Sequence, residues 1–219
     1  MTIEVKLEVM ADAERLALRA AQWLAALAAA SRKRFTVALS GGSTPKPMYQ
    51  ALAGMDLPWP RMQWFFGDER FVPPDDPASN WRMAREAMFD RAPPTQVHPV
   101  PTVGVTPDEA AAAYEAELLA LGDTPLFDVV LLGLGNDGHT ASLFPGSAVL
   151  DERERLVRAT DNGRITLTYP ALESARHIAF LVSGTEKRSM LRRLASGDHT
   201  IPAGRVKGDI TIFADAAAA

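Results

Sequence analysis

The stretch Val129-Val-Leu-Leu-Gly-Leu-Gly-Asn-Asp-Gly-His-Thr-Ala-Ser-Leu-Phe-Pro-Gly146 decides the fold. It begins with an apolar run, which predicts a buried strand over residues 129–132. Three glycines follow, and Asp137 and His139 stand two residues apart where this strand should end. Open α/β sheets bind ligands just beyond the carboxyl ends of their strands. The acid and the imidazole are therefore candidate catalytic residues.

Strand-like and helix-like segments alternate along the rest of the chain. Apolar patterning predicts strands over residues 3–9, 35–39, 62–66, 97–100, 155–160, 164–168, 178–182 and 210–213. Caps and helical spacing predict helices over residues 12–30, 45–52, 79–89, 106–121 and 183–194. This alternation favours an α/β fold with a mostly parallel sheet and helices on both faces. No linker is long enough to divide residues 1–219, so one domain is expected, with a frayed Ala-rich tail.

A glycine turn after the predicted strand 35–39 has the features of an anion site. Gly41, Gly42, Ser43 and Thr44 lie between this strand and the start of the next helix. The free N–H groups and the positive dipole end of a helix N-terminus favour an anion. Glycines let the backbone approach the ligand closely. These four residues are therefore expected to bind a charged part of a ligand.

Further polar residues follow or begin other predicted elements. Asp68 and Arg70 come after the strand 62–66, and Asn80 begins the helix that follows. Arg164 begins a strand after a turn with hairpin chemistry, and Lys187 lies at the start of the helix 183–194. Each residue taken singly is an ordinary surface charge or turn residue. Their shared placement at the ends of elements raises the expectation that they converge on one pocket.

The composition excludes several classes of protein. The chain has 219 residues, of which 47% are hydrophobic, and its net charge of −4 argues against general binding of nucleic acid or of an anionic membrane. It contains no cysteine, which excludes disulfides, thiolate catalysis and cysteine metal sites and fits a cytoplasmic protein. No signal peptide or membrane span is expected. No histidine pairs with His139 at metal-ligand spacing, so no metal site is expected either.

Two other motif interpretations are weak. Residues 133–138 match G-x-G-x-x-G, but Pro145 interrupts the helix that a dinucleotide loop requires, and no acidic residue follows at the expected spacing. Ser40 lies in a near match to the nucleophile elbow of serine esterases, but the first glycine of that motif is missing. Asp137 and His139 themselves could merely satisfy the backbone of a glycine turn.

Five stretches together resemble the 6-phosphogluconolactonases, in that family's order and over nearly the whole chain. They are Ser40-Gly-Gly-Ser-Thr-Pro45, Gly67-Asp-Glu-Arg-Phe-Val-Pro73 with Ser79-Asn80, the stretch from Gly133 to Gly146, Arg164-Ile-Thr-Leu-Thr168, and Gly184-Thr-Glu-Lys187. The sister family of glucosamine-6-phosphate deaminases is similar at the first and third stretches, but it carries a glutamate where this chain has Phe144. A phenylalanine cannot transfer the proton of that ring-opening step, so the resemblance favours the lactonases.

The resemblance implies a three-layer α/β/α, Rossmann-like fold and hydrolysis of 6-phosphogluconolactone in the oxidative pentose phosphate pathway, without a metal or another cofactor. His139 is then expected to act as general base on water, with Asp137 orienting it. Arg70 and Lys187, and less clearly Arg164, are expected at the phosphate, whereas Asp68 is expected to meet sugar hydroxyls or to hold Arg70. A deaminase-like enzyme and a non-catalytic sugar-phosphate sensor are the alternatives. The absence of an obvious exposed apolar stripe favours a monomer.

Overall fold

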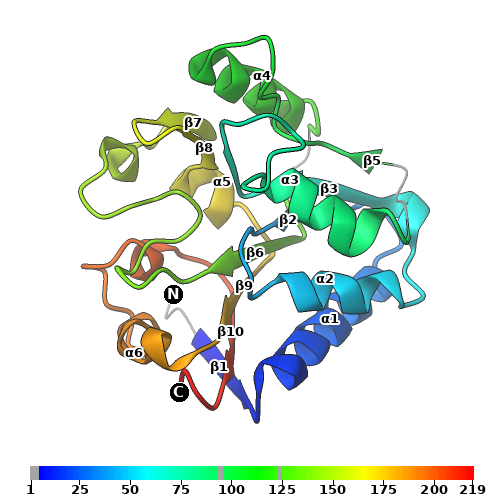
Figure 1. Cartoon of the computed structure of the whole chain (residues 1–219), viewed down its shortest axis with the longest axis vertical. Coiled ribbons are helices and arrows are strands. Elements are labelled where there is room, and N and C mark those ends of the chain that lie inside the picture. Colours follow the sequence, from blue (N-terminus) through cyan, green and yellow to red (C-terminus); the bar gives the residue numbers. More distant parts are fainter. Residues whose placement is uncertain (1–4, 93–95, 123–124) are drawn as a thin grey trace.

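A computed structural model describes residues 5–92, 96–122 and 125–219 of the chain (Figure 1). The first two residues of the predicted strand 3–9 lie outside these ranges. The architecture is the predicted one, a mostly parallel sheet between two layers of helices. Among the described residues, no helix is long and apolar enough to cross a membrane.

A seven-stranded sheet forms the centre of the molecule. Its order is β1-β10-β9-β6-β2-β3-β5, and every neighbouring pair is parallel. The strands are β1 (Val5–Met10), β2 (Phe35–Leu39), β3 (Met62–Phe66), β5 (Gln96–Val97), β6 (Val129–Gly133), β9 (His177–Val182) and β10 (Ile210–Asp215). The interior strands are almost wholly apolar and buried, as expected for strands covered on both faces. The strand that opens the deciding stretch, β6, is the central one.

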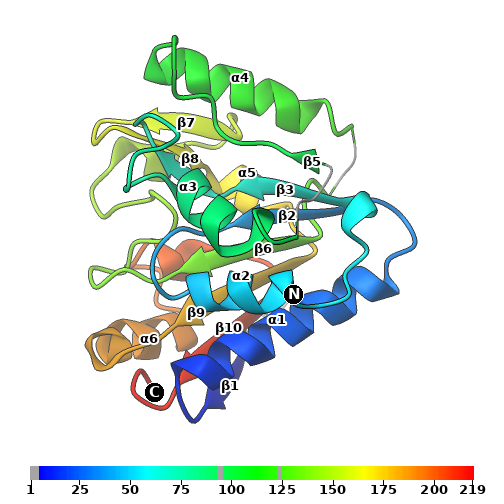
Figure 2. The same cartoon turned by 45° about the vertical axis from the view of Figure 1, so that its right-hand side comes forward.

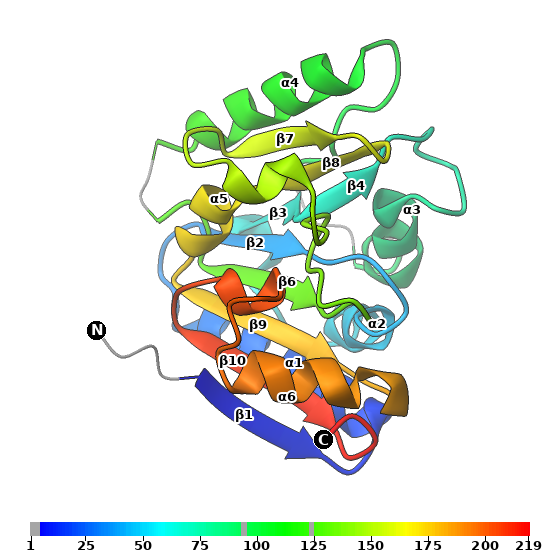
Figure 3. The same cartoon turned by 90° about the vertical axis from the view of Figure 1, so that its left-hand side faces the viewer.

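Helices cover both faces of this sheet. The bounds are α1 (Ala13–Ala30), α2 (Lys46–Ala53), α3 (Asn80–Ala84), α4 (Pro107–Leu119), α5 (Tyr169–Glu173) and α6 (Arg188–Ala195), with a π-helical turn over Arg85–Phe89 and 3₁₀ turns over Trp59–Arg61, Ala148–Asp151, Thr185–Lys187 and Ala203–Arg205. Figures 1 and 3 show α1, α2 and α3 on one side of the sheet and α5 and α6 on the other. The predicted caps are confirmed, because Asp12 accepts a hydrogen bond at the start of α1 and Thr106 forms a full capping box at α4.

A second, antiparallel sheet lies beside β3, below α4 (Figure 2). It consists of β4 (Asp68–Arg70), β8 (Arg164–Leu167) and β7 (Val157–Thr160). The predicted hairpin of β7 and β8 is confirmed. The sequence did not predict β4, whose three charged residues carry no apolar pattern. Pairing of β4 with β8 places Arg70 opposite Arg164, although 94 positions (164 − 70) separate them in the chain.

The Ala-rich tail is not frayed, so that expectation is wrong. Asp215, the last residue of β10, accepts a hydrogen bond of 2.8 Å from the N–H of Ala218, which is fully buried. The N–H of Ala216 donates to the carbonyl of Met10 over 2.8 Å. A buried carboxylate at the strand end thus gives the tail the backbone partners that its own side chains cannot provide.

Candidate active site

The candidate active site is a cavity of about 880 Å³ at the carboxyl ends of the central strands. The segments after β2, β3, β6 and β9 all reach it, because these four strands are parallel neighbours in the sheet. Every candidate residue of the sequence except Asn80 lines this cavity: Gly41, Gly42, Ser43, Thr44, Asp68, Arg70, Asp137, His139, Arg164 and Lys187. Parallel topology therefore brings together residues that are far apart in the chain.

Asp137 and His139 form a close pair. The carboxylate Oδ1 of Asp137 lies 2.6 Å from Nδ1 of the His139 ring and also accepts the backbone N–H of His139 over 3.0 Å. Burial alone raises the pKa of Asp137, but the hydrogen bonds from the backbone and the ring of His139 outweigh it and lower that pKa from its usual value. An ionised carboxylate at Nδ1 favours the tautomer that carries its proton there and leaves the Nε2 lone pair free.

The glycine-rich turn after β6 holds this pair in place. The N–H of Gly135 donates to the carbonyl of His139 over 2.8 Å, and the hydroxyl of Thr140 donates to the carbonyl of Gly133 over 2.9 Å. A Cβ at position 135 would lie 2.0 Å from Nδ1 of His139. Gly135 therefore serves close packing of the imidazole against the backbone rather than dinucleotide binding.

Phe144 contacts the catalytic candidate directly. Its ring centroid lies 4.2 Å from that of His139, and the guanidinium carbon of Arg164 lies 5.4 Å from the centroid of the same phenyl ring. Both distances are in the range of favourable aromatic and cation–π contacts. Phe144 thus lies between the imidazole and one of the candidate phosphate ligands.

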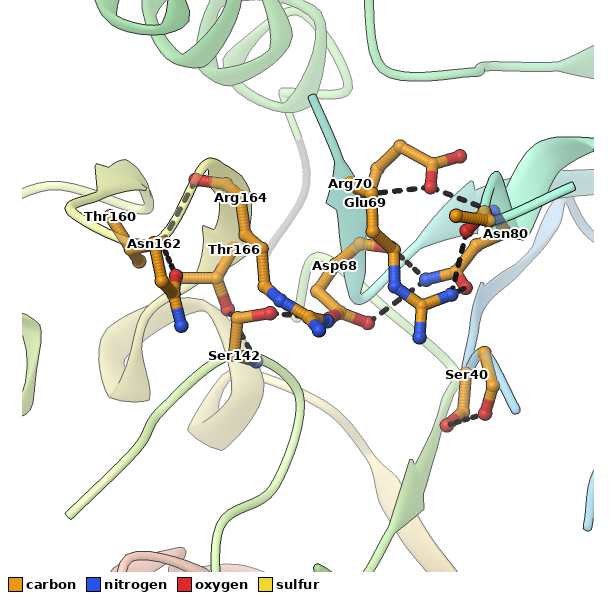
Figure 4. Close-up of polar contacts among 12 residues, drawn as sticks. Ser40, Asp68, Glu69, Arg70, Asn80, Ser142, Thr160, Asn162, Arg164 and Thr166 are labelled. Carbon is orange, nitrogen blue, oxygen red and sulfur yellow. Dashed lines mark hydrogen bonds and ion pairs between the residues drawn. The ribbon is translucent and has the colours of Figure 1, made fainter. Parts of the chain in front are cut away.

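Asp68 lies among polar and charged groups at one wall of the cavity (Figure 4). It is buried, accepts a hydrogen bond of 2.5 Å from the hydroxyl of the buried Ser142, and lies 3.7 Å from a guanidinium nitrogen of Arg164. Its other oxygen accepts from the side-chain amide of Asn80 over 3.2 Å. Of the two roles expected for Asp68, holding Arg70 is not met, because its ion pair is with Arg164, and contact with sugar hydroxyls stays a prediction.

Arg70 is held instead by Asn80 and by the loop before it. One guanidinium nitrogen of Arg70 donates to the side-chain oxygen of Asn80 and to the carbonyl of Ala78. Figure 4 shows Arg70 and Arg164 extending from neighbouring strands on either side of Asp68. Burial and the nearby positive charge of Arg70 lower the pKa of Arg164 from its usual value. Two arginines that repel each other beside a cavity favour an anionic ligand there.

Asn80 does not line the cavity but packs behind residues that do. It is almost fully buried at the first position of α3, and a Cβ on Gly41 would lie 2.0 Å from its side-chain oxygen. Asn80 therefore lies against both the glycine turn and Arg70. A role in positioning these two groups, rather than direct contact with a ligand, fits this placement.

The glycine turn and Lys187 complete the charged end of the site. Gly42 has φ of 101°, a left-handed conformation that favours glycine, and α2 begins at Lys46 after Ser43 and Thr44. Lys187 ends the 3₁₀ turn after β9, and Gly184 before that turn has φ of 104°. The carboxylate of Asp215 accepts from the hydroxyl of Ser183 and from the N–H of Gly184, which anchors the segment that carries Lys187.

Three residues of the site were not predicted as such. Ser142, within the stretch 129–146, donates a hydrogen bond to Asp68, and Glu186, beside Lys187, lines the cavity. Ser40 also lines it, but its hydroxyl donates to the carbonyl of Gly41 and no hydrogen bond joins it to His139 in the described structure. This arrangement does not favour the serine-esterase interpretation.

Within the described ranges, no three His, Asp or Glu side chains are placed to share a metal ion.

Comparison with known proteins places this geometry in a family. Residues 11–213 match the family described as glucosamine-6-phosphate isomerases/6-phosphogluconolactonase. The curated 6-phosphogluconolactonase of Nostoc is 45% identical over 200 residues, 84% of this chain and 83% of that protein. The solved 6-phosphogluconolactonase of Trypanosoma cruzi has a TM-score of 0.87 and 31% identity, over 100% of this chain and 97% of the other.

A solved monomeric glucosamine-6-phosphate deaminase is also similar, with a TM-score of 0.84 over 97% of this chain and 98% of its own. Its identity to this chain is 22%, so it demonstrates only that the fold is shared. The identity and coverage of the curated relative, together with the family match over most of the chain, go further than a shared fold. The chain belongs to the family of glucosamine-6-phosphate isomerases and 6-phosphogluconolactonases.

Proposed function

We propose that this enzyme hydrolyses 6-phospho-D-glucono-1,5-lactone to 6-phospho-D-gluconate, a step of the oxidative pentose phosphate pathway, with His139 as general base. One observation carries the mechanism: the Asp137–His139 pair lines the same cavity as three cationic side chains, Arg70, Arg164 and Lys187. The names of the relatives support the substrate. A lactone is a reactive ester, so a base for water and a site for the phosphate meet the needs of the reaction.

The first step is attack of water on the lactone carbonyl. Nε2 of the neutral His139 ring takes a proton as the water oxygen bonds to the carbonyl carbon. Asp137 keeps the other ring nitrogen protonated and stabilises the imidazolium that forms. Such base assistance typically contributes about 10²–10⁴-fold. The bond between the carbonyl carbon and the ring oxygen then breaks, and the imidazolium returns its proton to that oxygen.

The negative charge on the carbonyl oxygen needs hydrogen-bond donors while the tetrahedral intermediate exists. The N–H of Gly138 already donates to the carbonyl of Gly135 over 3.0 Å. Gly41 and Gly42 line the cavity, and their backbone N–H groups donate to no other group in the described part of the chain. These two groups are therefore our choice for the oxyanion donors.

The phosphate lies at the other end of the sugar. Arg70 and Arg164 offer planar forks to its oxygens, and Lys187 offers a point charge. The start of α2 at Ser43 and Thr44 adds hydroxyls and the positive end of the helix. Binding energy from this end orients the carbonyl against His139, which raises turnover rather than affinity alone.

The decisive experiment measures proton release from freshly prepared 6-phosphogluconolactone, corrected for spontaneous hydrolysis. His139→Ala should lower turnover by about 10²-fold or more, the contribution of a general base. His177→Ala is the matched control, because Nδ1 of His177 lies 2.6 Å from the carboxylate of Asp209 in a second His–Asp pair outside this cavity. Near-normal turnover by the His139 variant would remove it as the base.

The alternative within the family is a glucosamine-6-phosphate deaminase. The shared fold is the observation in its favour, and Phe144, which contacts His139, is the observation against it. Ammonia release from glucosamine 6-phosphate decides between the two activities. A rate comparable to that on the lactone would replace our proposal with the deaminase.

A further inference from the structure

A second cavity, of about 460 Å³, lies outside the candidate active site and shares no lining residue with it. It is formed by α5, by the loop after the 3₁₀ turn Ala148–Asp151, and by the segment between α6 and β10 (Figure 3). We name it the second cavity; its lining residues are Arg153, Tyr169, Pro170, Glu173, His199, Arg205 and Lys207.

The charges of the second cavity are unbalanced. Three cations line it and only one carboxylate, that of Glu173. Within the described ranges, Arg153 and Arg205 form no ion pair; their guanidinium groups donate to backbone carbonyls, those of residues 150 and 152 for Arg153 and that of His199 for Arg205. These bonds fix the positions of the cations without neutralising them. Such a set of cations favours a bound anion.

The wall of the second cavity suits a compact ligand with several anionic oxygens. The guanidinium carbon of Arg153 lies 5.7 Å from the ring centroid of the buried Tyr169, so this arginine is stacked rather than free to swing away. Nδ1 of His199 lies 2.7 Å from the carbonyl of Gly204, and this contact holds the ring in the wall of the cavity. The planar guanidinium groups of Arg153 and Arg205 and the ammonium group of Lys207 match the oxygens of a phosphate group.

The same segment also contacts the catalytic turn. The N–H of Ala203 donates to the carbonyl of Gly138 over 2.9 Å, and a Cβ on Gly138 would lie 2.6 Å from Cβ of Ile201. Gly138 stands between Asp137 and His139. On the side of the second cavity, the hydroxyl of Tyr169 donates to the carbonyl of Pro202 over 2.9 Å. Residues 199–205 thus form one short connection between the two cavities.

We propose that the second cavity binds a small phosphorylated metabolite, held by Arg153, Arg205 and Lys207. Binding there changes the surroundings of Gly138 through residues 201–203. Binding at one cavity then alters the affinity of the other by the same factor, because coupling between two sites is reciprocal. The binding site does not depend on which reaction the enzyme catalyses.

Nuclear magnetic resonance of the ¹⁵N-labelled protein, titrated with inorganic pyrophosphate, tests this proposal. Amide signals of residues 199–208 other than Pro202 report the second cavity, and those of residues 41–44 report the candidate active site. We expect saturable shifts of residues 199–208, with the amide of Gly138 following their midpoint. Shifts confined to residues 41–44, or a Gly138 signal that follows only those residues, would overturn the proposal.

Matched charge reversals locate the site. Lys207→Glu should weaken the binding seen at residues 199–208 by about tenfold or more, the effect of losing one charge-assisted hydrogen bond. Arg192→Glu changes another exposed cation, which lines neither cavity, and should leave the midpoint unchanged. Arg153→Gln provides a second variant that removes one fork without adding a negative charge. Equal midpoints in all three variants would mean that the second cavity does not bind the anion.

Discussion

The ring of Phe144 lies 4.2 Å from the imidazole of His139, and the two planes are tilted by 34°. The phenyl ring therefore keeps water from part of the imidazole and presents no charge to it. The guanidinium carbon of Arg164 lies 5.4 Å from the centroid of the same phenyl ring. One uncharged side chain that cannot transfer a proton therefore contacts both the candidate base and a candidate phosphate ligand.

Phe144→Glu should shift the acid limb of the pH–rate profile of lactone hydrolysis. A carboxylate within contact of His139 favours the imidazolium, so the neutral base forms only at higher pH, and a shift upward of about one pH unit is expected. Phe144→Leu is the control, since it removes the ring without adding charge and should leave the limb in place. Equal profiles for the two variants would show that charge at position 144 does not act on the base.

Asp137→Asn should lower kcat by about 10²–10⁴-fold with a small change in KM. An amide cannot stabilise the imidazolium, and it can favour the tautomer with its proton on the nitrogen that must accept one. Asp209→Asn breaks the equivalent contact of the second His–Asp pair and serves as the control for the loss of such a pair. A kcat within twofold of the parent for Asp137→Asn would contradict the orienting role.

Lys187→Ala and Arg70→Ala should impair hydrolysis of the phosphorylated lactone far more than that of unphosphorylated gluconolactone. Loss of one charge-assisted contact predicts about a tenfold or greater fall in kcat/KM for the phosphorylated substrate. Arg192→Ala, outside the cavity, controls for the change in net charge. Equal losses on both substrates would mean that these side chains do not hold the phosphate.

Much of the site could be predicted because the sheet is parallel. Polar residues placed after β2, β3, β6 and β9 share one edge by topology, so their convergence follows from where each strand ends. The partners of each charge could not be predicted in the same way. The pairing of Asp68 with Arg164 depends on β4, whose Asp-Glu-Arg sequence has no strand pattern and pairs only because β8 lies beside it.

The position of the Asn80 side chain and the ordered tail also could not be predicted from the sequence alone. The sequence puts Asn80 at a helix start near the site, but only the packing against Gly41 shows that its amide lies behind the wall. No side chain of the Ala-rich tail indicates from the sequence that the tail is ordered. Its partners are the carboxylate of Asp215 and the backbone of Met10, both contributed by other parts of the fold.

Asp215 should make stability depend on pH. Burial alone raises its pKa, but hydrogen bonds from Ser183 and from backbone N–H groups outweigh it and lower the pKa from its usual value. A carboxyl group whose folded pKa is lowered stabilises the protein above its unfolded pKa, and this contribution is lost as pH falls through the folded value.

Asp215→Asn should therefore lower the free energy of unfolding in urea by about 1–3 kcal/mol at pH 7, the effect of losing charge-assisted hydrogen bonds. The difference between parent and variant should shrink on acidification toward pH 2, as the parent carboxylate is protonated. Asp209→Asn, at an exposed carboxylate, is the comparison. A difference that stays constant between pH 7 and pH 2 would rule out the ionised carboxylate as its source.

Gly135→Ala should disable the base without unfolding the protein. The added Cβ would lie 2.0 Å from Nδ1 of His139 and 2.7 Å from Oδ1 of Asp137, so the imidazole has to move. Displacement of a catalytic group by about 1 Å typically costs about 10²-fold in rate. Gly133→Ala is the matched control two residues away, because its nearest neighbour, the hydroxyl of Ser40, lies at an ordinary contact distance of 3.6 Å. Turnover should therefore fall in the first variant and persist in the second, with similar melting temperatures; equal turnover would mean that the position of the imidazole does not set the rate.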